Sequence, residues 1–429
     1  MKNYKIMGIK LPAYLAILAV ILVAIQFDSL PGGMIGAFAF MMVVGAILDV
    51  IGNNTPIVKT FFGGGAIVII FGSSALVYFN IIPVSVTENV TTFMKSGGFL
   101  DFYIAALITG SMLGMNKKLL IKASARYLPC ILGGFIMALI FVVLGGLAFG
   151  QSPSESIAYI GIPIMGGGMG AGAVPIAEVF SSTMGVPADE ILSKLVPAVA
   201  LGNAIAIVFG GLLNRLGKKY PSLTGNGKLM ETGEEDLIHV EEDNSVGFKD
   251  FGIGILLSVT FFIFGRLVAN IMESFIGLDI HTYAWMIISV ALAKALDIVP
   301  VEYEKACTKW YKFVASNWTT TLLMGIGIAY TDLAQVISAF SLVYIILCFL
   351  VVLGAVIGAG IFGKLVGFYP IEAAITAGLC MANMGGTGDV AVLTASDRME
   401  LMPFAQISSR LGGAFIILLA TVLIPIFFK

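Results

Sequence analysis

Charged residues are scarce in this 429-residue sequence, where Asp, Glu, Lys and Arg together make up 12% against 58% hydrophobic residues. With a mean hydropathy of +0.99, the chain carries more apolar surface than a water-soluble core of this length could bury. The composition therefore predicts an integral membrane protein. The formal net charge is only −2 and no concentrated basic face stands out, so we expect no nucleic-acid partner.

Cysteine and histidine are also rare. The four cysteines are scattered singly, which predicts neither a disulfide framework nor metal-ligand spacing. The two histidines, His239 and His281, belong to no metal or catalytic motif. Because no paired His, Ser/His/Asp set or metal-ligand cluster is evident, the sequence argues against a membrane enzyme and implies no cofactor.

Long apolar runs, by contrast, are abundant. A helix needs about 20 residues to cross a hydrocarbon core of about 30 Å. By this measure the sequence predicts an all-α polytopic membrane protein of about 11 transmembrane helices. These spans are expected near residues 12–28, 34–51, 64–83, 99–116, 127–149, 190–214, 250–275, 282–299, 318–336, 338–363 and 403–428. The first apolar run has no small-residue cleavage site after it, so we expect it to remain as a span.

Basic residues fall almost entirely on one side of these spans, which predicts a cytoplasmic N-terminus and an outside C-terminus in a bacterial cytoplasmic membrane. Only Lys95 and Lys429 fall on the opposite side. The residues on the predicted cytoplasmic side are Lys2, Lys5, Lys10, Lys59, Lys117, Lys118, Lys122, Arg126, Arg215, Lys218, Lys219, Lys249, Lys305, Lys309, Lys312, Lys364 and Arg398.

Two more apolar segments, roughly 155–182 and 369–390, do not fit as full crossings. Counting either as a span would reverse the sidedness of the basic residues after it. We therefore expect two re-entrant hairpin segments, the first entering from outside and the second from the cytoplasm. Irregular backbone at membrane depth is tolerated only where it is buried in protein or lines a wet cavity, so both segments are candidates for a substrate site.

The two halves of the chain also resemble each other. Gly167 to Gly170 matches Gly385 to Gly388, and "LGNAIAI" at 201–207 echoes "LGGAFII" at 411–417. The predicted organisation is an N-terminal transmembrane helix (1–33), a first repeat (34–214), a cytoplasmic linker (215–249) and a second repeat (250–429). With five crossings in each repeat, the second is inverted relative to the first. Inverted-topology repeats with broken segments indicate a secondary transporter whose site lies at the repeat interface.

The Gly-rich loops suit ligand contact, because glycine lets consecutive backbone N–H groups approach an anion closely. The alternative is that these glycines only permit close helix packing in lipid. Neither loop has the phosphate-binding pattern G-x-x-x-x-G-K-[ST]. We therefore expect transport to be driven by an ion gradient or by exchange rather than by a nucleotide.

Arg410, in "PFAQISSRLGGAF", lies about 10 Å into the last predicted span at 1.5 Å per residue. An Arg at that depth is costly unless it faces a partner or a polar cavity. Its guanidinium can hold a carboxylate through two parallel hydrogen bonds, with Gln406, Ser409 and Gly413 beside it. The alternative is snorkelling to the cytoplasmic interface.

Asp389 follows the second Gly-rich loop. A carboxylate beside the Thr387 hydroxyl and the Asn383 amide offers oxygen ligands suited to Na⁺, or a site for a proton. The alternatives are a salt bridge or a helix N-cap. Its counterpart in the first repeat is Ala171, so the charge is not required by the repeated fold.

The stretches "CMANMGGTGDVAVL", "ISSRLGGA" and "GGGMGAG", with the central hydrophilic loop, resemble the bacterial 2-hydroxycarboxylate transporter family, which takes up citrate or malate. The resemblance covers essentially the whole chain. It implies a homodimer in the lipid bilayer, with an elevator motion of a substrate-carrying domain and symport of Na⁺ or H⁺. The alternative is exchange of malate or citrate against a monocarboxylate such as lactate. An anion channel fits less well, because a lone deep Arg beside a carboxylate suits the binding of one organic anion.

The resemblance also assigns the candidate site. The expected substrate-binding residues are Gly168, Met169, Gly170, Asn383, Gly385, Gly386, Thr387, Ser409 and Arg410. The expected Na⁺ site combines Asp389, Thr387 and Asn383. Within the family the residue before the second Gly-Gly pair can be basic, whereas here it is Met384. One fewer cation would face a third carboxylate, which favours malate-like substrates over citrate.

Overall fold

The computed structural model describes residues 5–56, 58, 64–114, 117–230, 247–276 and 282–428. The side chains of some residues within these ranges, among them Thr387, Gln406 and Arg410, lie outside the description. The described chain is almost wholly helical. Its two strands, β1 (Lys5–Ile6) and β2 (Ile9–Lys10), form one short antiparallel ribbon ahead of the first helix.

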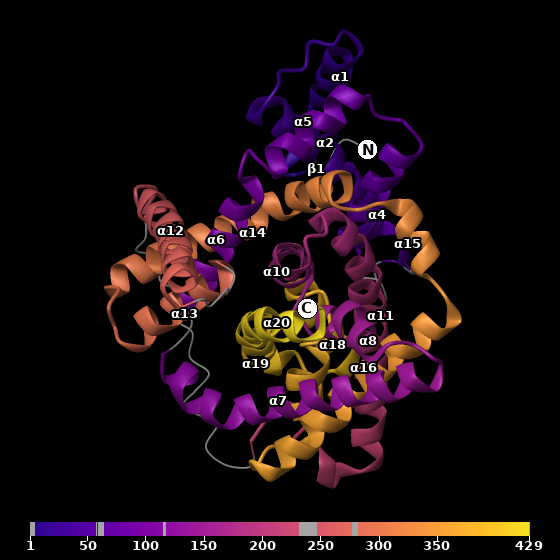
Figure 1. The fold of residues 1–429 in the computed structure, drawn as a ribbon, viewed down its shortest axis with the longest axis vertical. Helices are drawn as coiled ribbons and strands as arrows, with labels where there is room; N and C mark the ends of the chain where they lie inside the picture. The colour runs from indigo at the N-terminus through magenta and orange to yellow at the C-terminus, as the bar shows by residue number, and fades with distance from the viewer. Residues whose placement is uncertain are drawn as a thin grey trace.

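One group of helices, which we call the flanking body, packs around the long helix α14. Its members are α1 (Leu11–Gln26), α2 (Met34–Asn54), α4 (Gly65–Tyr78), α5 (Val84–Met94), α6 (Phe99–Leu113), α12 (Asp250–Ile276), α13 (Thr282–Ala295) and α14 (Val301–Ala329). Helix α14 contacts α2, α4, α5, α6 and α12, which come from both halves of the chain. Figure 1 shows α12 and α13 at one side of the molecule and α1, α2 and α5 at another.

The remaining helices form a second group, the hairpin body, in which α16 lies along α7. From the first half it contains α7 (Lys117–Ala148), α8 (Pro153–Ser156), η1 (Ile157–Gly161), α9 (Ile162–Ile164), η2 (Met169–Ala173), α10 (Val174–Met184) and α11 (Ala188–Lys219). From the second it contains α16 (Leu342–Leu365), α17 (Pro370–Ala373), η4 (Ala374–Leu379), α18 (Gly386–Ser396), η5 (Met399–Leu401), α19 (Met402–Ile407), η6 (Ser408–Gly412) and α20 (Gly413–Phe428). Helix α15 (Leu333–Ala339) contacts both bodies, through α4 and α11.

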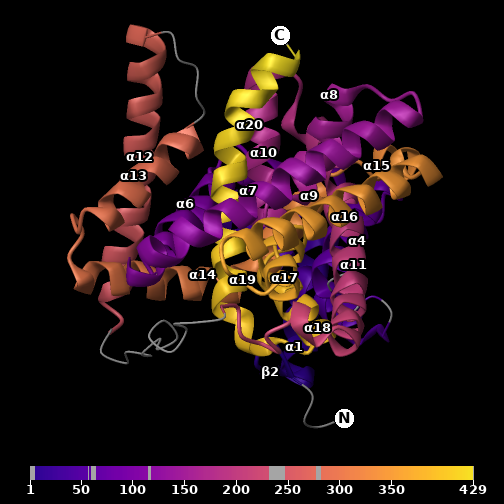
Figure 2. The same cartoon turned by 90° about the horizontal axis from the view of Figure 1, so that it is seen from below.

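Both predicted re-entrant segments are helix–break–helix hairpins. The first runs from α8 to α10 and the second from α17 to α18. Proline at the start of α8 and of α17 presets the helical φ angle there. At the breaks, Gly167, Gly168 and Gly385 have φ values of +77°, +126° and +77°, which glycine adopts without strain. In Figure 2, α8 and the end of α20 lie at one face, whereas β2 and α18 lie toward the opposite face.

The predicted count of about 11 crossings stays a prediction. Among the described residues, five helices are long and apolar enough to cross a membrane by length and composition, or six if the bent pair α5–α6 is one span. The shorter apolar helices include α1, α13 and α20. The last predicted span, 403–428, is interrupted by the π-helical segment η6 between α19 and α20.

The predicted span 318–336 has the wrong limits. Helix α14 begins at Val301, so Lys305, Lys309 and Lys312 lie within it rather than before it. Its first half is amphipathic, with Cys307, Trp310 and Val314 buried at 0%, 3% and 0% exposure. A hydropathy window discounts such a half-polar helix, although one of its faces is as buried as a core helix.

The linker predicted at 215–249 is also shorter than expected. Helix α11 continues to Lys219, and a 3₁₀ turn follows at Pro221–Leu223. Residues 224–230 then contact the start of the second hairpin, as described below. Residues 231–246, which include His239, lie outside the described part of the chain, as does His281.

Candidate functional site

The two Gly-rich loops meet tip to tip inside the hairpin body. A Cβ added at Gly168 would lie 2.9 Å from the carbonyl oxygen of Met384, and one at Gly385 would lie 3.1 Å from that of Gly167. A Cβ at Gly167 would lie 2.4 Å from the carbonyl oxygen of Ser409, in η6. Both the positive φ angles and these backbone contacts require glycine. The close-packing reading of the glycines is therefore part of their role.

A cavity of about 530 Å³ opens in front of these loops, between the two bodies. On the hairpin side it is lined by Gly168, Met169, Gly385, Asp389 and Ser409, all predicted site residues, together with Gly167 and Met384. On the flanking side the lining comes from α2, α4, α6, α13 and α14. The volume falls within the range of small-molecule sites, about 300–1,000 Å³.

Asp389 lies at the centre of a buried polar cluster in this wall. Its Oδ1 accepts a hydrogen bond from Asn383 Nδ2 at 2.9 Å, and its Oδ2 accepts one from Ser409 Oγ at 3.0 Å. Asn383 in turn accepts from the N–H of Gly385 at 2.7 Å. Asp389 and Asn383 are both 0% exposed. The carboxylate is thus held by the second loop and by η6 together.

The helix-cap alternative for Asp389 is wrong, because the residue capping α18 is Gly385. Asp389 lies one turn into this helix, where its N–H donates to the carbonyl oxygen of Gly385. A negative charge in the first turn of a helix is favoured by the positive end of the helix dipole. The arrangement therefore stabilises the carboxylate and leaves it facing the cavity.

Several predicted site residues are placed only by their backbone. Gly170 belongs to η2, Gly386 and Thr387 to the first turn of α18, and Arg410 to η6. The side chains of Thr387 and Arg410 are outside the described part, so their predicted contacts with substrate and cation stay predictions. Asn383 turns its amide toward Asp389 and Gly385. It reaches the cavity through Asp389.

The described π-helical segments all fall in the hairpin body, at η1, η2, η4 and η6. Two of them, η2 and η6, carry predicted site residues directly behind the cavity. Tyr127 of α7 supports η6, because its hydroxyl bonds the Ser408 hydroxyl at 2.7 Å and donates to the carbonyl oxygen of Phe404 at 3.2 Å. Single π-helical turns are frequent at functional sites, since they rearrange backbone groups inside a helix.

Sequence reasoning missed Asn203. This side chain of α11 is 0% exposed, and its Oδ1 accepts from the N–H of Met384 at 3.1 Å. A Cβ at Gly388 would lie 2.7 Å from the same oxygen. Asn203 thus holds the second loop from the first half of the chain. Its place in the repeated "LGNAIAI" stretch, opposite Gly413 of "LGGAFII", was the available signal.

The flanking wall carries polar groups that the sequence did not single out either. Asp49 accepts from Asn53 Nδ2 at 3.0 Å, and Asn53 accepts from the N–H of Gly65 at 3.0 Å. Deeper in the cavity, the hydroxyls of Tyr103 and Thr319 are 2.6 Å apart. The cavity therefore presents polar groups on both walls, as a site for a hydrophilic ligand requires.

The sequence matches the family model described as the 2-hydroxycarboxylate transporter family over residues 6–422. A Na⁺-malate symporter of Bacillus subtilis is 42% identical over 99% of this chain and 94% of its own length. A citrate/sodium symporter of Salmonella typhimurium is 38% identical, covering 98% and 94%. The citrate transporter CitP of Leuconostoc mesenteroides is 37% identical, covering 98% and 94%.

These matches and the apolar helices define the chain as a multi-pass membrane transporter rather than an enzyme. The chain belongs to the 2-hydroxycarboxylate transporter family.

Proposed function

We propose that the protein is a secondary transporter that couples the uptake of a malate-like 2-hydroxycarboxylate to Na⁺. The observation that carries this proposal is the cavity between the two bodies, where both Gly-rich loops and the Asp389 carboxylate form one wall. The relatives named as Na⁺-malate and citrate/sodium symporters support the choice of substrate class and cation.

The cation is assigned to the cluster around Asp389. Na⁺ prefers oxygen ligands, and this cluster offers the Asp389 carboxylate, the Ser409 hydroxyl and nearby loop carbonyls. We include Thr387 and Asn383 in the site as the sequence predicts. Asp389 and the dicarboxylate are both negative, so a cation bound between them lowers their mutual repulsion. This is the physical basis of the proposed coupling.

The substrate is assigned to the cavity in front of the loops. Backbone N–H groups at the start of α18 and of η2 would meet one carboxylate, and Arg410 would meet another. Met384 places a thioether at the cavity wall and is 8% exposed. A third carboxylate would find no cation at that position, which favours a dicarboxylate.

Movement of the hairpin body past the flanking body, as an elevator, would carry the site across the membrane. The packing supports this division, since each body draws helices from both halves of the chain, as paired inverted repeats would. We also propose the homodimer that the family resemblance implies, with the N-terminus inside and the C-terminus outside. Chemical cross-linking of intact membranes, read as a band of twice the monomer mass, tests the dimer.

Uptake into proteoliposomes tests the function itself. Malate, citrate and lactate are each offered with an inward gradient of Na⁺, of H⁺ or of neither, and with or without internal lactate. We expect malate to accumulate with the Na⁺ gradient alone. Uptake that needs only internal lactate would establish exchange instead. Non-saturable flux would indicate a channel.

The predicted topology is tested by single cysteines at Ser154 and Lys228 in a protein without its native cysteines. Ser154 lies before the first hairpin and Lys228 beside the second, and Lys228 is exposed. The neighbouring Asn226 suits a probe less well, because it accepts a hydrogen bond from Arg398. We expect an impermeant maleimide to label Ser154→Cys, but not Lys228→Cys, in intact cells. Labelling of both from one side would contradict the inverted repeats.

Substrate choice is tested at Met384. We expect Met384→Arg to lower the Km for citrate relative to malate by about tenfold, because one charge-assisted hydrogen bond contributes about 1.5–3 kcal/mol. Met384→Leu, which keeps the volume and adds no charge, is the matched control. An unchanged ratio of kcat/Km for the two substrates would place Met384 outside the substrate contact.

A further inference from the structure

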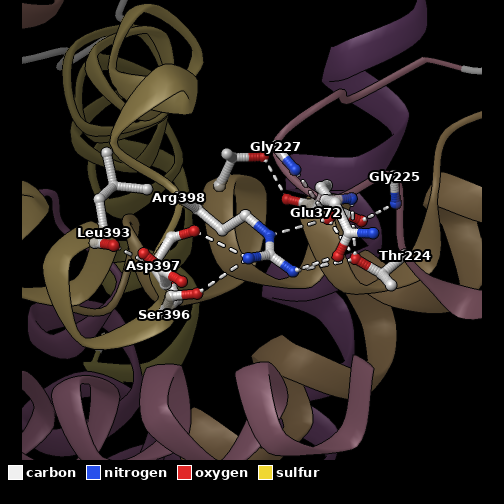
Figure 3. A network of polar contacts seen from close by, with 10 residues as sticks. Thr224, Gly225, Gly227, Glu372, Leu393, Ser396, Asp397 and Arg398 are labelled. Carbon is white, nitrogen blue, oxygen red and sulfur yellow. Dashed lines mark hydrogen bonds and ion pairs between the residues drawn. The ribbon is translucent and has the colours of Figure 1, made fainter. Parts of the chain in front are cut away.

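A buried ion pair closes the base of the second hairpin, away from the cavity (Figure 3). Nε of Arg398 donates to Oε1 of Glu372 at 3.1 Å, and the two side chains are 5% and 0% exposed. Glu372 lies in α17, in the first limb of the hairpin, and Arg398 follows α18, the second limb. The pair therefore joins the two ends of one re-entrant segment.

A third segment of the chain completes this network. The Thr224 hydroxyl donates to Oε1 of Glu372 at 2.6 Å and accepts from a terminal nitrogen of Arg398 at 3.2 Å. The backbone N–H groups of Gly225 and Gly227 donate to the Glu372 carboxylate at 3.0 and 3.4 Å. We call Thr224, Glu372 and Arg398 the clasp. Figure 3 shows the three converging from separate parts of the ribbon.

Arg398 also bonds the backbone at the end of α18. Its other terminal nitrogen donates to the carbonyl oxygens of Asp397 at 2.8 Å and Ser396 at 3.3 Å. Carbonyl groups at a helix end lack partners within the helix, so this guanidinium supplies them. With its carboxylate and guanidinium both multiply bonded, the clasp offsets the desolvation of two buried charges, which a single contact does not achieve.

The segment after the clasp continues along the start of the hairpin. The N–H of Tyr369 donates to the carbonyl oxygen of Leu229 at 3.0 Å, and Met230 pairs with Phe368 in an antiparallel bridge. A Cβ at Gly225 would lie 2.4 Å from the ring of Tyr369. Residues 224–230 are therefore packed onto the hairpin body as part of it.

We propose that Thr224, Glu372 and Arg398 are positioning residues of the transport cycle, which keep the base of the second hairpin closed in every state. Separating the two limbs would leave two buried charges without partners, which is strongly unfavourable. The second loop can then move only together with α11 and the rest of the hairpin body. The hairpin does not open from its base to release substrate. This inference rests on the proposed alternating movement of the hairpin body.

A covalent link across the base tests the inference directly. Met230 and Phe368 are bridge partners, and such partners have Cα atoms about 4.5–5.5 Å apart, within the range of a disulfide. We would introduce Met230→Cys and Phe368→Cys in a protein without its native cysteines and compare oxidised with reduced samples of the same preparation. The oxidised protein should accumulate malate at the rate of the reduced protein. Reversible loss of transport on oxidation would overturn the inference.

A second cysteine pair separates this inference from the proposed function. Lys95, after α5 of the flanking body, lies 3.5 Å from Asp189 in α11 of the hairpin body. Linking Lys95→Cys to Asp189→Cys with a short bifunctional thiol reagent should stop transport, because it ties the two bodies together. If this link leaves transport unchanged, the proposed movement is wrong. If it stops transport and the Met230–Phe368 link also stops it, only the clasp inference is wrong.

Thr224→Val provides a test without cysteine chemistry. It keeps the shape of the side chain and both charges but removes the hydroxyl that joins Glu372 to Arg398. A base that opens part of the time lowers the fraction of protein with a formed loop, and the apparent affinity falls by that fraction. We expect the apparent Km for malate to rise about 3- to 10-fold. The Met230–Phe368 disulfide should restore it. An unchanged Km, or a raised Km that the disulfide does not restore, would contradict a positioning role.

Discussion

Asp389→Asn should abolish Na⁺-driven accumulation of malate while leaving the protein folded in the membrane. The substitution keeps the shape of the side chain, and the Asn383 amide can still donate to its remaining oxygen. The Ser409 hydroxyl, which also lies 3.2 Å from the carbonyl oxygen of Ala405, can rotate to accept from the new amide. What disappears is the negative charge that a bound cation balances.

The measurement is malate uptake into proteoliposomes at a series of Na⁺ concentrations. We expect the accumulation ratio to fall to the equilibrium value, and the dependence of malate binding on Na⁺ to weaken by about 10- to 150-fold, which corresponds to the 1.5–3 kcal/mol of one charge-assisted contact. Asp397→Asn is the matched control, because Asp397 is exposed at the end of the same helix, with φ +57°, which Asn tolerates. An Asp389→Asn protein with unchanged Na⁺ dependence would place the cation elsewhere.

The helices of this fold are largely predictable from hydropathy, because lipid requires long apolar segments. The span expected at 250–275 coincides with α12, Asp250–Ile276. The two hairpins were also predictable, although hydropathy alone would have made each a span. What identified them was the sidedness of the basic residues, a constraint that acts on the whole chain and not on one window.

The clasp was not predictable, because its members are distant in sequence and each has a plain local explanation. Arg398 was one more basic residue on the predicted cytoplasmic side, and Glu372 a single acid at the start of an apolar segment. Thr224 lay in a stretch whose polarity is typical of a free linker. Only the fold brings them within 3.2 Å of one another. Buried polar networks depend on tertiary geometry, which a one-dimensional pattern does not contain.

The candidate site was predictable in part for a related reason. The Gly-rich loops and Asp389 stood out because such residues are unusual in a membrane sequence. Asn203 and Asp49 did not, since each lies within an otherwise ordinary helix and has no motif around it. Asn203 supports the loop that the sequence did identify, through the backbone of Met384. Supporting residues of this kind are recognised by their contacts rather than by their type.

Arg410→Lys should leave the protein normally inserted but raise the Km for every dicarboxylate. Lys keeps the positive charge and loses the planar fork that donates two parallel hydrogen bonds to a carboxylate. Loss of one such bond corresponds to about 1.5–3 kcal/mol, or roughly a 10- to 150-fold weaker binding. Arg410→Ala, which also removes the charge, should be worse. The measurement is the concentration dependence of malate uptake, with Arg215→Lys, at an exposed position near the end of α11, as the matched control.

Lactate uptake decides which carboxylate Arg410 holds. The backbone of Arg410 lies in η6, next to Ser409, whose hydroxyl bonds the Asp389 carboxylate, so the guanidinium begins close to the proposed cation. If Arg410 holds the second carboxylate of malate, the Km for lactate should change much less than the Km for malate, because lactate has no such group. Equal losses for both substrates would assign Arg410 to the carboxylate that they share. Unchanged kinetics for both would mean that the side chain extends to the membrane interface and takes no part in binding.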